Sequence, residues 1–300
     1  MKKFIFTRFG IGVFDPRWYD FRLSIFESIT FPSIINLKSE ELYWVIFIDE
    51  NIPVRAKEKL ANLISTYKSK EKKILMKEVK FVFEVPGKMK SFIESKIDGE
   101  KEKFLLSRID DDDAIRLDTI ELVEEKCKEN NNDAELALTF PVGYEFLVAE
   151  RKILKCNRPF LTMNTYLYIN QEKLTDALRI GHHRVKEWAQ KNDLQIEELY
   201  TNGPMYLYSR HKQSDSNFLG IRKTILEDSN VKFITQRVYQ DFNIDQVSFQ
   251  KLRDNYNDFP SIGREKLWDR NKEQIQLAIE YYQKLDEIKK KMIENTKNVF

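Results

Sequence analysis

Four consecutive aspartates, at positions 110–113, directly follow an apolar segment at 103–109. Carboxylates this close repel one another, so the run is costly unless a cation or solvent relieves it. Hard divalent cations such as Mg²⁺ and Mn²⁺ take oxygen ligands and keep open positions for substrate phosphates. Asp110 and Asp112 could present two carboxylates to one such ion. The alternative is a solvated acidic turn in which Asp113 caps the following helix.

A further acidic residue, Asp49, ends the apolar run 42–48 in the same way. Its carboxylate could hydrogen-bond a ribose hydroxyl or a base, or it could serve as a cap or turn residue. The chain contains neither G-x-G-x-x-G nor G-x-x-x-x-G-K-[ST], the two fingerprints of phosphate-binding loops. Phosphates would therefore have to be held by a metal and by basic side chains, and Arg8, at the end of the first apolar run, is a candidate.

These side chains need a scaffold, and the first half of the chain alternates short apolar runs with helical patterns. We predict strands at 4–7, 42–48, 80–85 and 103–109, and helices at 20–29, 54–67 and 116–127. This alternation favours an α/β fold, with a mostly parallel central sheet and helices on both faces. Ligands bind outside the carboxyl ends of the strands in such sheets, which is where Asp49 and the aspartate run fall.

The second half is richer in β-prone segments separated by turn residues, which favours antiparallel pairing. We expect strands at 134–140, 144–148, 160–169 and 205–209, and one or two helices within 172–192. Residues 212–216 contain no apolar side chain and predict a mobile loop.

From about residue 261 the chain predicts a long charged helix with one apolar stripe. Such a helix would pack on the body of the protein or against a second copy, as in a homodimer. Its basic Lys289-Lys290-Lys291 also allows a peripheral contact with the inner face of a membrane.

The composition excludes several classes of function. The 300 residues carry 50 Lys and Arg against 48 Asp and Glu, a net charge of +2, which argues against nucleic-acid binding through a basic surface. Two cysteines exclude a disulfide scaffold or a four-thiolate zinc site. No apolar run approaches the roughly 18 residues that span a bilayer. Arg8 also interrupts the apolar start too early for a signal peptide, so we expect a cytoplasmic protein.

Four motifs occur in an order that resembles the rhamnosyltransferase family of bacterial polysaccharide synthesis. They are Thr7-Arg8-Phe9, Phe31-Pro32-Ser33-Ile34, Ile48-Asp49 and the segment SRIDDDDAI at 107–115. The resemblance covers about residues 1–215 and implies a catalytic domain with the Rossmann-like A-type glycosyltransferase fold. Its nucleotide-binding half would be about 1–115 and its acceptor half about 116–215, followed by a helical extension at 216–300.

The resemblance also implies a reaction, in which a sugar such as rhamnose passes from a nucleotide-diphospho-sugar donor to a hydroxyl of a surface polysaccharide. A DxD motif would bind Mn²⁺ or Mg²⁺ through Asp110 and Asp112. His211 stands after the strand at 205–209, where a histidine completes the metal shell in many enzymes of this fold. The residues implied to contact the donor nucleotide are Thr7, Arg8, Asp49, Arg108, Asp110 and Asp111.

If the reaction inverts configuration, a carboxylate or a histidine must take the proton of the acceptor hydroxyl. The candidates are Asp176, Glu145, Glu187 and His183, which belongs to the adjacent pair His182-His183. Inverting and retaining outcomes both stay open at this point.

Two other functions remain as alternatives. One is a metal-dependent nucleotidyl- or phosphoryl-transferase, for which Gly10-Ile11-Gly12 would be a reduced phosphate loop. The other is a non-catalytic carbohydrate-binding or assembly protein whose C-terminal helix contacts a partner.

Overall fold

The computed structural model describes residues 1–261 except 68, 131–133 and 215–217, together with residues 276, 280 and 283. The helix predicted from residue 261 onward therefore lies outside the described residues, apart from Gln276, Glu280 and Gln283, which are helical. Within the described part of the chain, no helix is both long enough and apolar enough to cross a membrane.

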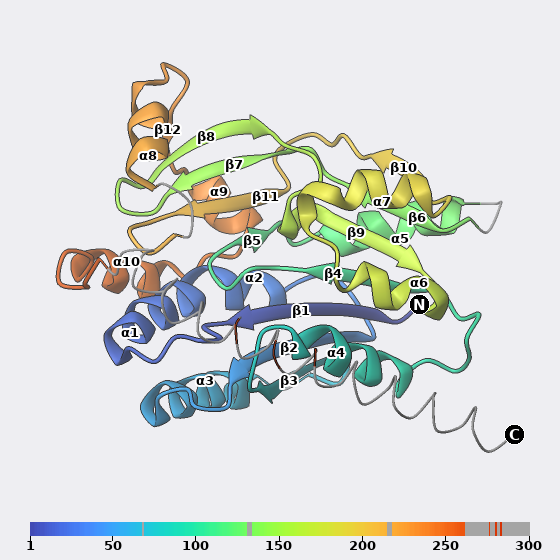
Figure 1. Cartoon of the computed structure of the whole chain (residues 1–300). Helices are drawn as coiled ribbons and strands as arrows, with labels where there is room; N and C mark the ends of the chain where they lie inside the picture. The colour runs from blue at the N-terminus through green and yellow to red at the C-terminus, as the bar shows by residue number, and fades with distance from the viewer. Residues whose placement is uncertain are drawn as a thin grey trace, which may run out of the picture.

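The strands and helices alternate along the chain, as the apolar pattern predicts (Figure 1). In chain order the strands are β1 (Lys3–Phe9), β2 (Leu42–Asp49), β3 (Lys72–Val79), β4 (Phe104–Arg108), β5 (Ala114–Ile115), β6 (Leu136–Thr139), β7 (Val142–Leu147), β8 (Lys152–Asn157), β9 (Thr165–Ile169), β10 (Gln195–Glu198), β11 (Tyr206–Arg210) and β12 (Lys232–Phe233). The α-helices are α1 (Pro16–Ile25), α2 (Phe31–Ile35), α3 (Val54–Thr66), α4 (Glu84–Glu94), α5 (Thr119–Glu129), α6 (Gln171–Ala177), α7 (Val185–Lys191), α8 (Phe218–Glu227), α9 (Gln236–Asp241) and α10 (Gln246–Asp254). Shorter turns are the π-helical η1 (Phe26–Thr30) and the 3₁₀ turns η2 (Thr162–Asn164) and η3 (His182–Arg184).

The described strands form two sheets. The larger has the order β10-β6-β9-β4-β1-β2-β3, in which β1 to β4 run parallel and β9 is antiparallel to β4 and β6. The smaller has the order β12-β8-β7-β11-β5, in which only the pairing of β7 with β11 is parallel. The α/β fold with a mostly parallel central sheet is confirmed, and the β-rich second half is largely antiparallel as expected.

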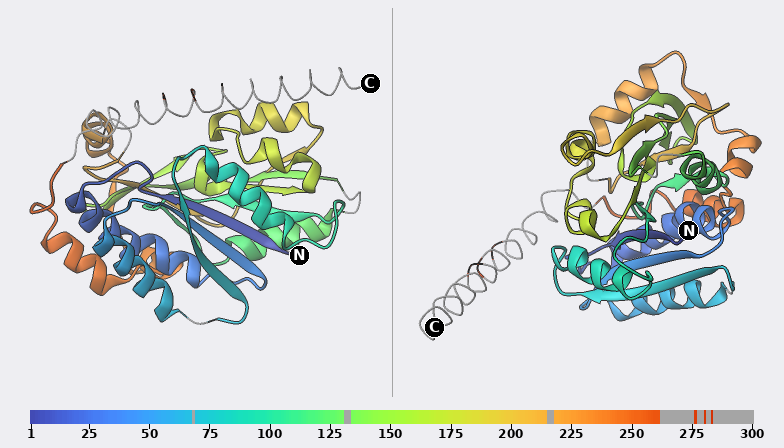
Figure 2. Two further views of the ribbon diagram at one scale, coloured as in Figure 1. Left: turned by 60° about the horizontal axis from the view of Figure 1, so that its bottom comes forward. Right: turned by 90° about the vertical axis from the view of Figure 1, so that its right-hand side faces the viewer.

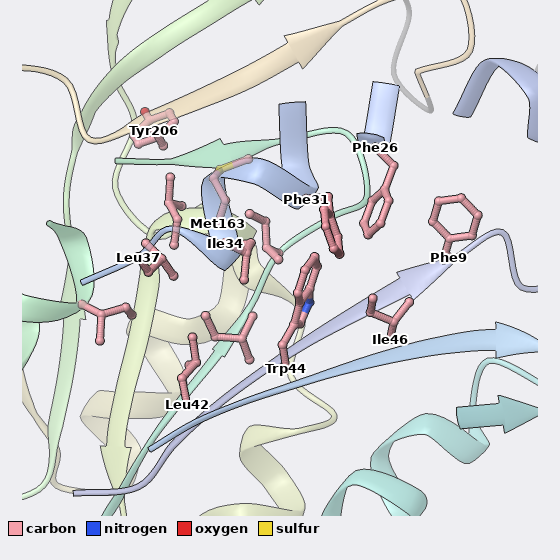
Figure 3. Packing of buried hydrophobic residues seen from close by; sticks show 14 of the residues in the cluster. Phe9, Phe26, Phe31, Ile34, Leu37, Leu42, Trp44, Ile46, Met163 and Tyr206 are labelled. Atoms are coloured by element: carbon pink, nitrogen blue, oxygen red, sulfur yellow. The ribbon is translucent and has the colours of Figure 1, made fainter. Parts of the chain in front are cut away.

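Helices cover both faces of the larger sheet, because its central strands are apolar on both sides (Figure 2). In β2, Trp44 and Ile46 face the core shared with α1, α2, α3 and α5, whereas Val45 and Phe47 face the core shared with α4, α6 and α7. Two apolar faces are typical of a parallel strand buried between helix layers. Trp44 packs against Phe26 and Phe31, with ring centroids 5.6 and 5.8 Å away (Figure 3).

The first helical segment is longer than its pattern predicts. Asp15 caps α1 by accepting the N–H of Arg17, and the helix then continues through the π-helical turn η1 into α2. Pro32 lies in the first turn of α2 and does not end the segment, because it directly follows the π-helical turn η1, where the regular i→i−4 hydrogen-bond pattern is already interrupted.

The strand predicted at 80–85 is wrong. Residues 72–79 form the edge strand β3, and Glu84 begins helix α4 while its carboxylate accepts the N–H of Lys80. Edge strands tolerate lysines and are only half-buried, so β3 has too few apolar residues to stand out. Strands β8 and β10 were not predicted for a similar reason, since both contain several charged or polar residues.

A third apolar core joins the smaller sheet to the C-terminal helices. Phe21 and Ile25 of α1 pack in this core with Phe249 and Leu252 of α10, and α9 also contributes to it. Strand β12 pairs with β8. The described part of 216–300 is therefore packed against both α1 and the smaller sheet (Figure 1).

Candidate active site

A cleft of about 280 Å³ opens where β1 and β4 end, between the larger sheet and β11. It is lined by charged residues, aromatic residues and a glycine-containing loop: Arg8, Gly10, Ile11, Val13, Trp18, Arg22, Val82, Asp110, Asp111, Asp112, Asp113, Tyr208, Ser209, Arg210 and Ser214. The whole aspartate run lies in this lining, at the strand end where α/β sheets bind their ligands.

Three of the four aspartates are buried. Asp111, Asp112 and Asp113 are 5%, 9% and 0% exposed, so the run is not a solvated turn. Asp113 does not cap α5, whose N-cap position is Asp118. Its Oδ1 instead accepts the N–H of Ser209 at 2.9 Å, which ties the run to β11.

The arginine of α1, Arg22, binds two of these carboxylates. Its Nε donates to Oδ2 of Asp111 at 3.1 Å, its Nη2 donates to Oδ1 of the same residue, and its Nη1 donates to Oδ2 of Asp112 at 2.8 Å. The guanidinium also lies 5.3 Å from the ring of Trp18. Arg22 is only 7% exposed, so the pairs are formed away from bulk water.

His211 joins the same cluster. Its Nδ1 accepts the backbone N–H of Gln213 at 3.2 Å, so in the neutral ring the proton is on Nε2, which donates to Oδ2 of Asp112 at 2.9 Å. Nη1 of Arg22 lies 3.0 Å from the same Nε2. The imidazole is fully buried and packs edge-on against Phe21, with ring centroids 5.3 Å apart.

The surroundings shift the pKa values of the aspartates and the histidine in this cluster in different directions. Burial, with a smaller effect of the nearby Asp112 charge, raises the pKa of Asp111 to about 6 although Arg22 opposes the shift. Burial alone would also raise the pKa of Asp112, but Arg22 and His211 hold that pKa well below its usual value. Burial and the neighbouring carboxylates raise the pKa of Asp113 well above its usual value. Burial and the charge of Arg22 lower the pKa of His211, so the imidazole is neutral at pH 7.

Arg8 and Asp110, two of the residues predicted to bind the donor, line the cleft. Asp110 keeps 35% of its side-chain exposure and lies 3.7 Å from Nε of Arg108. Arg108 itself lines a separate, smaller cavity of about 50 Å³ and donates to Oγ1 of Thr162 at 2.9 Å. Arg108 is therefore not part of the main cleft lining, but its guanidinium pairs with Asp110, which is.

Two residues expected to bind the donor have structural roles instead. Asp49 is fully buried, and its two carboxylate oxygens accept the N–H groups of Gly12, at 2.9 Å, and Asn51, at 2.8 Å. Thr7 is fully buried, and its Oγ1 accepts Nε1–H of Trp44 at 3.0 Å. Neither residue is part of the cleft lining, and the polar side-chain atoms of both are bound within the protein.

The glycine loop after β1 is held by the same contact. Gly10 and Gly12 have φ values of +62° and +83°, in the left-handed region that favours glycine. Because the N–H of Gly12 is bound to Asp49, it is not presented to a phosphate. The loop shapes one wall of the cleft and does not form a phosphate-binding loop of the kind considered above.

The candidate catalytic bases lie outside the cleft lining. Asp176 on α6, Glu187 on α7 and His183 in η3 are exposed. Glu145 on β7 is buried but forms ion pairs with Arg210, at 2.6 Å, and Arg158, at 2.7 Å. None of the four lines this cleft, and Glu145 pairs with Arg210, whose guanidinium lies 3.9 Å from the centroid of the Tyr208 ring.

The residues present do not fit the expected metal site of Asp110, Asp112 and His211. Asp112 and His211 do meet, but the proton on Nε2 points at the carboxylate and Arg22 contacts both. Asp110 faces Arg108 instead. Within the described residues, no group of three or more His, Cys, Asp or Glu side chains is placed to hold a metal ion.

Sequence reasoning missed Arg22, Trp18 and Arg210. A signal for Arg22 was present, because it stands among apolar and aromatic residues in a helix that is buried over most of its length. An arginine in such a helix needs a buried counter-charge, and the aspartate run is the densest source of one. Arg210 directly precedes the singled-out His211, but its partner Glu145 had been considered only as a base.

A family model described as "Putative rhamnosyl transferase" matches residues 11–223, which is more than half of the chain. The chain belongs to this family. The rhamnosyl transferase match contains Arg22, the aspartate run and His211, so the central cluster of the cleft lies within the family region.

Solved structures share more distant similarity with this rhamnosyl transferase family member. S. aureus TarS 1–349 is 12% identical, with a TM-score of 0.40 over 70% of this chain and 60% of that fragment. The same fragment in complex with UDP is 13% identical, with a TM-score of 0.39 over 70% and 61%. A 4-diphosphocytidyl-2C-methyl-D-erythritol synthase is 15% identical, with a TM-score of 0.32 over 67% and 89%. The chain thus spans about 60% of the TarS fragment. No curated protein matches the chain by sequence.

Proposed function

We propose that this member of the rhamnosyl transferase family is a glycosyltransferase, which moves a sugar from a nucleotide-diphospho-sugar to a hydroxyl of a glycan acceptor. The family description points to rhamnose as the sugar to test first. The cleft at the ends of β1 and β4 is the proposed site of transfer.

One observation carries this proposal. Arg8 lines the cleft and is half-buried, yet within the described residues it forms neither a hydrogen bond nor an ion pair. An arginine held at a cleft without a carboxylate partner is well suited to bind a phosphate, since its planar guanidinium matches two phosphate oxygens. We assign Arg8 to the diphosphate of the donor.

The remaining lining suits the rest of such a donor. Tyr208 offers aromatic surface for a sugar ring or base, and Asp110 offers an accessible carboxylate for hydroxyl groups. Nε1 of Trp18, Oδ2 of Asp113 and Oγ of Ser209 are buried without a hydrogen-bond partner in the described part of the chain. Buried polar atoms are usually paired, so these three support a bound ligand or water in the cleft.

The proposed step is a displacement at the anomeric carbon. The acceptor oxygen bonds to that carbon, and the bond from the carbon to the diphosphate oxygen breaks with its electron pair going to the diphosphate. The acceptor proton passes to a carboxylate of the cleft or to water. Fixed positive charge stabilises the diphosphate as its negative charge grows, and Arg8, which has no ion pair within the described residues, places such charge in the lining.

The test is release of nucleoside diphosphate from a panel of nucleotide sugars, with and without added Mg²⁺ or Mn²⁺. The proposal predicts slow release from one or a few donors and faster release with an acceptor glycan. Release of pyrophosphate from a nucleoside triphosphate and a sugar phosphate would instead identify a nucleotidyltransferase. Sugar binding without release from any donor would identify a carbohydrate-binding protein.

A further inference from the structure

The guanidinium of Arg22 occupies the centre of the cluster in which a divalent ion was expected. It lies within 3.1 Å of one carboxylate oxygen of Asp111, 2.8 Å of one oxygen of Asp112 and 3.0 Å of Nε2 of His211. Carboxylate oxygens and an imidazole nitrogen are common ligands of Mn²⁺. Here one protein cation contacts all three side chains.

Arg22 is fixed in this position from both sides of its helix. Phe21 and Ile25 are fully buried in the core beneath the smaller sheet, and Leu23 packs in the core of the larger sheet. The helix therefore delivers Arg22 between the two sheets, where three of its nitrogen atoms are already bound to carboxylates. Moving it away would leave the buried Asp111 and Asp112 without their counter-charge.

The contacts of His211 also disfavour metal binding by its imidazole. A metal ligand must offer a lone pair, and neutral histidine has only one unprotonated ring nitrogen. In His211 that nitrogen is Nδ1, which accepts the N–H of Gln213. Nε2, the nitrogen that faces the cluster, already lies 2.9 Å from Oδ2 of Asp112 and 3.0 Å from Nη1 of Arg22.

We propose that Arg22 replaces the divalent metal of this cleft, so that Asp111 and Asp112 share a protein cation as their counter-charge and sugar transfer needs no metal ion. This inference rests on the proposed function for its catalytic part. Its structural part, the exclusion of Mn²⁺ from the cluster, stands on the contacts alone. Arg8, which lines the same cleft, would then supply the positive charge for the leaving diphosphate.

The first arm of the test is calorimetric titration of the full chain with Mn²⁺ alone. We expect no saturable binding to the wild type at millimolar Mn²⁺. In Arg22→Met, the freed carboxylates of Asp111 and Asp112 should bind Mn²⁺, and adding Asp112→Asn should abolish that binding. Arg17→Met is the matched control, since Arg17 is on the same helix, is 72% exposed and pairs only with Asp15 among the described residues.

The second arm is donor hydrolysis by the wild type in EDTA. We expect the rate to stay within twofold of the rate in Mn²⁺ or Mg²⁺. Arg22→Lys, which keeps a cation, guards against a folding defect in Arg22→Met and should likewise show no gain of Mn²⁺ binding.

Three results overturn the inference. They are saturable Mn²⁺ binding to the wild type that Asp112→Asn removes, loss of hydrolysis in EDTA that Mn²⁺ restores, and a folded Arg22→Met protein that binds no more Mn²⁺ than Arg17→Met. If no donor is hydrolysed under any condition, the proposed function fails. The calorimetric arm still decides whether Arg22 excludes the metal.

Discussion

Nη1 of Arg22 donates to Oδ2 of Asp112 at 2.8 Å, although 90 residues separate them in the sequence. Both side chains are largely buried, and removing one partner of a buried ion pair destabilises a protein by about 3–5 kcal/mol because the other charge is left unpaired. We expect Arg22→Met to lower the free energy of unfolding by that amount, as measured by urea denaturation.

A double-mutant cycle isolates this pair from the rest of the cluster. Arg22→Met combined with Asp112→Asn should cost less than the sum of the single changes, with a coupling energy of about 1 kcal/mol or more. Additive effects would mean that the contact does not contribute to the folded state. A change for Arg22→Met below about 0.5 kcal/mol, as for a surface substitution, would contradict the buried position of Arg22.

Asp49 distinguishes a structural role from a donor-binding role. Its carboxylate accepts two backbone N–H groups, from Gly12 and Asn51, and a buried donor left unsatisfied costs about 1–3 kcal/mol. Asp49→Ala should therefore lower the melting temperature and disturb the loop that bears Gly10 and Ile11. If Asp49→Ala melted like the wild type but bound the donor less tightly, the structural assignment would be wrong.

The secondary structure could be predicted from the sequence where the hydrophobic pattern of a segment matches the way its side chains are buried. Strand β2 is a continuous apolar run because helices cover both its faces, and β4 followed by four aspartates placed the site at a strand end. The edge strand β3 could not be predicted, since its partly exposed lysines resemble those of a surface helix. The hydrophobic pattern of a segment reflects how its side chains are buried, so it predicts secondary structure least well for half-buried segments such as β3.

The site was predictable in location and not in its contacts. Asp112 and His211 were predicted to share a metal site with Asp110, and the structure brings the first two to 2.9 Å of each other while Asp110 pairs with Arg108. No spacing rule connects Arg22 to either, because that contact depends on how α1 is held between the two sheets. Asp49 and Glu145 were selected because they are carboxylates that could bind the donor or act as a base. In the structure, Asp49 binds the N–H of Gly12 and Glu145 pairs with Arg210.

Lys212 links the C-terminal segment to the site. Its Nζ donates to the carbonyl groups of Tyr256 and Phe259 and lies 4.8 Å from the Tyr256 ring centroid. Gln213, the next residue, is buried and donates its N–H to His211. This described part of the predicted mobile loop is therefore anchored against the protein.

Lys212→Met should loosen that anchor and leave His211 less well oriented. We expect donor hydrolysis to fall about tenfold, equivalent to about 1.4 kcal/mol. The control is Lys223→Met, because Lys223 is 78% exposed and pairs only with Glu227 among the described residues. Equal rates for the two variants would show that the anchor does not affect the site.

The reactivity of the two cysteine thiols at alkaline pH tests whether they are buried. Burial raises the pKa of Cys127 to about 12 and also raises the pKa of Cys156. At pH 8.5 the folded protein should resist alkylation by iodoacetamide at Cys127, whereas the urea-unfolded chain should react quickly. Because the unfolded thiol ionises near its ordinary pKa of 9, this group's contribution to stability falls as the pH rises from about 9 toward 12. Labelling of Cys127 at the unfolded rate would contradict its place on the buried face of α5.

Arg8 tests the central claim most directly. The measurement is the rate of nucleoside diphosphate release from the best nucleotide sugar by the wild type, Arg8→Gln and the exposed control Arg17→Gln. A charge-assisted hydrogen bond to phosphate is worth about 1.5–3 kcal/mol, so Arg8→Gln should reduce kcat/KM by roughly 10- to 100-fold while Arg17→Gln stays near the wild-type value. Equal rates for all three proteins, or no release from any donor, would contradict a nucleotide-sugar transferase that works in this cleft.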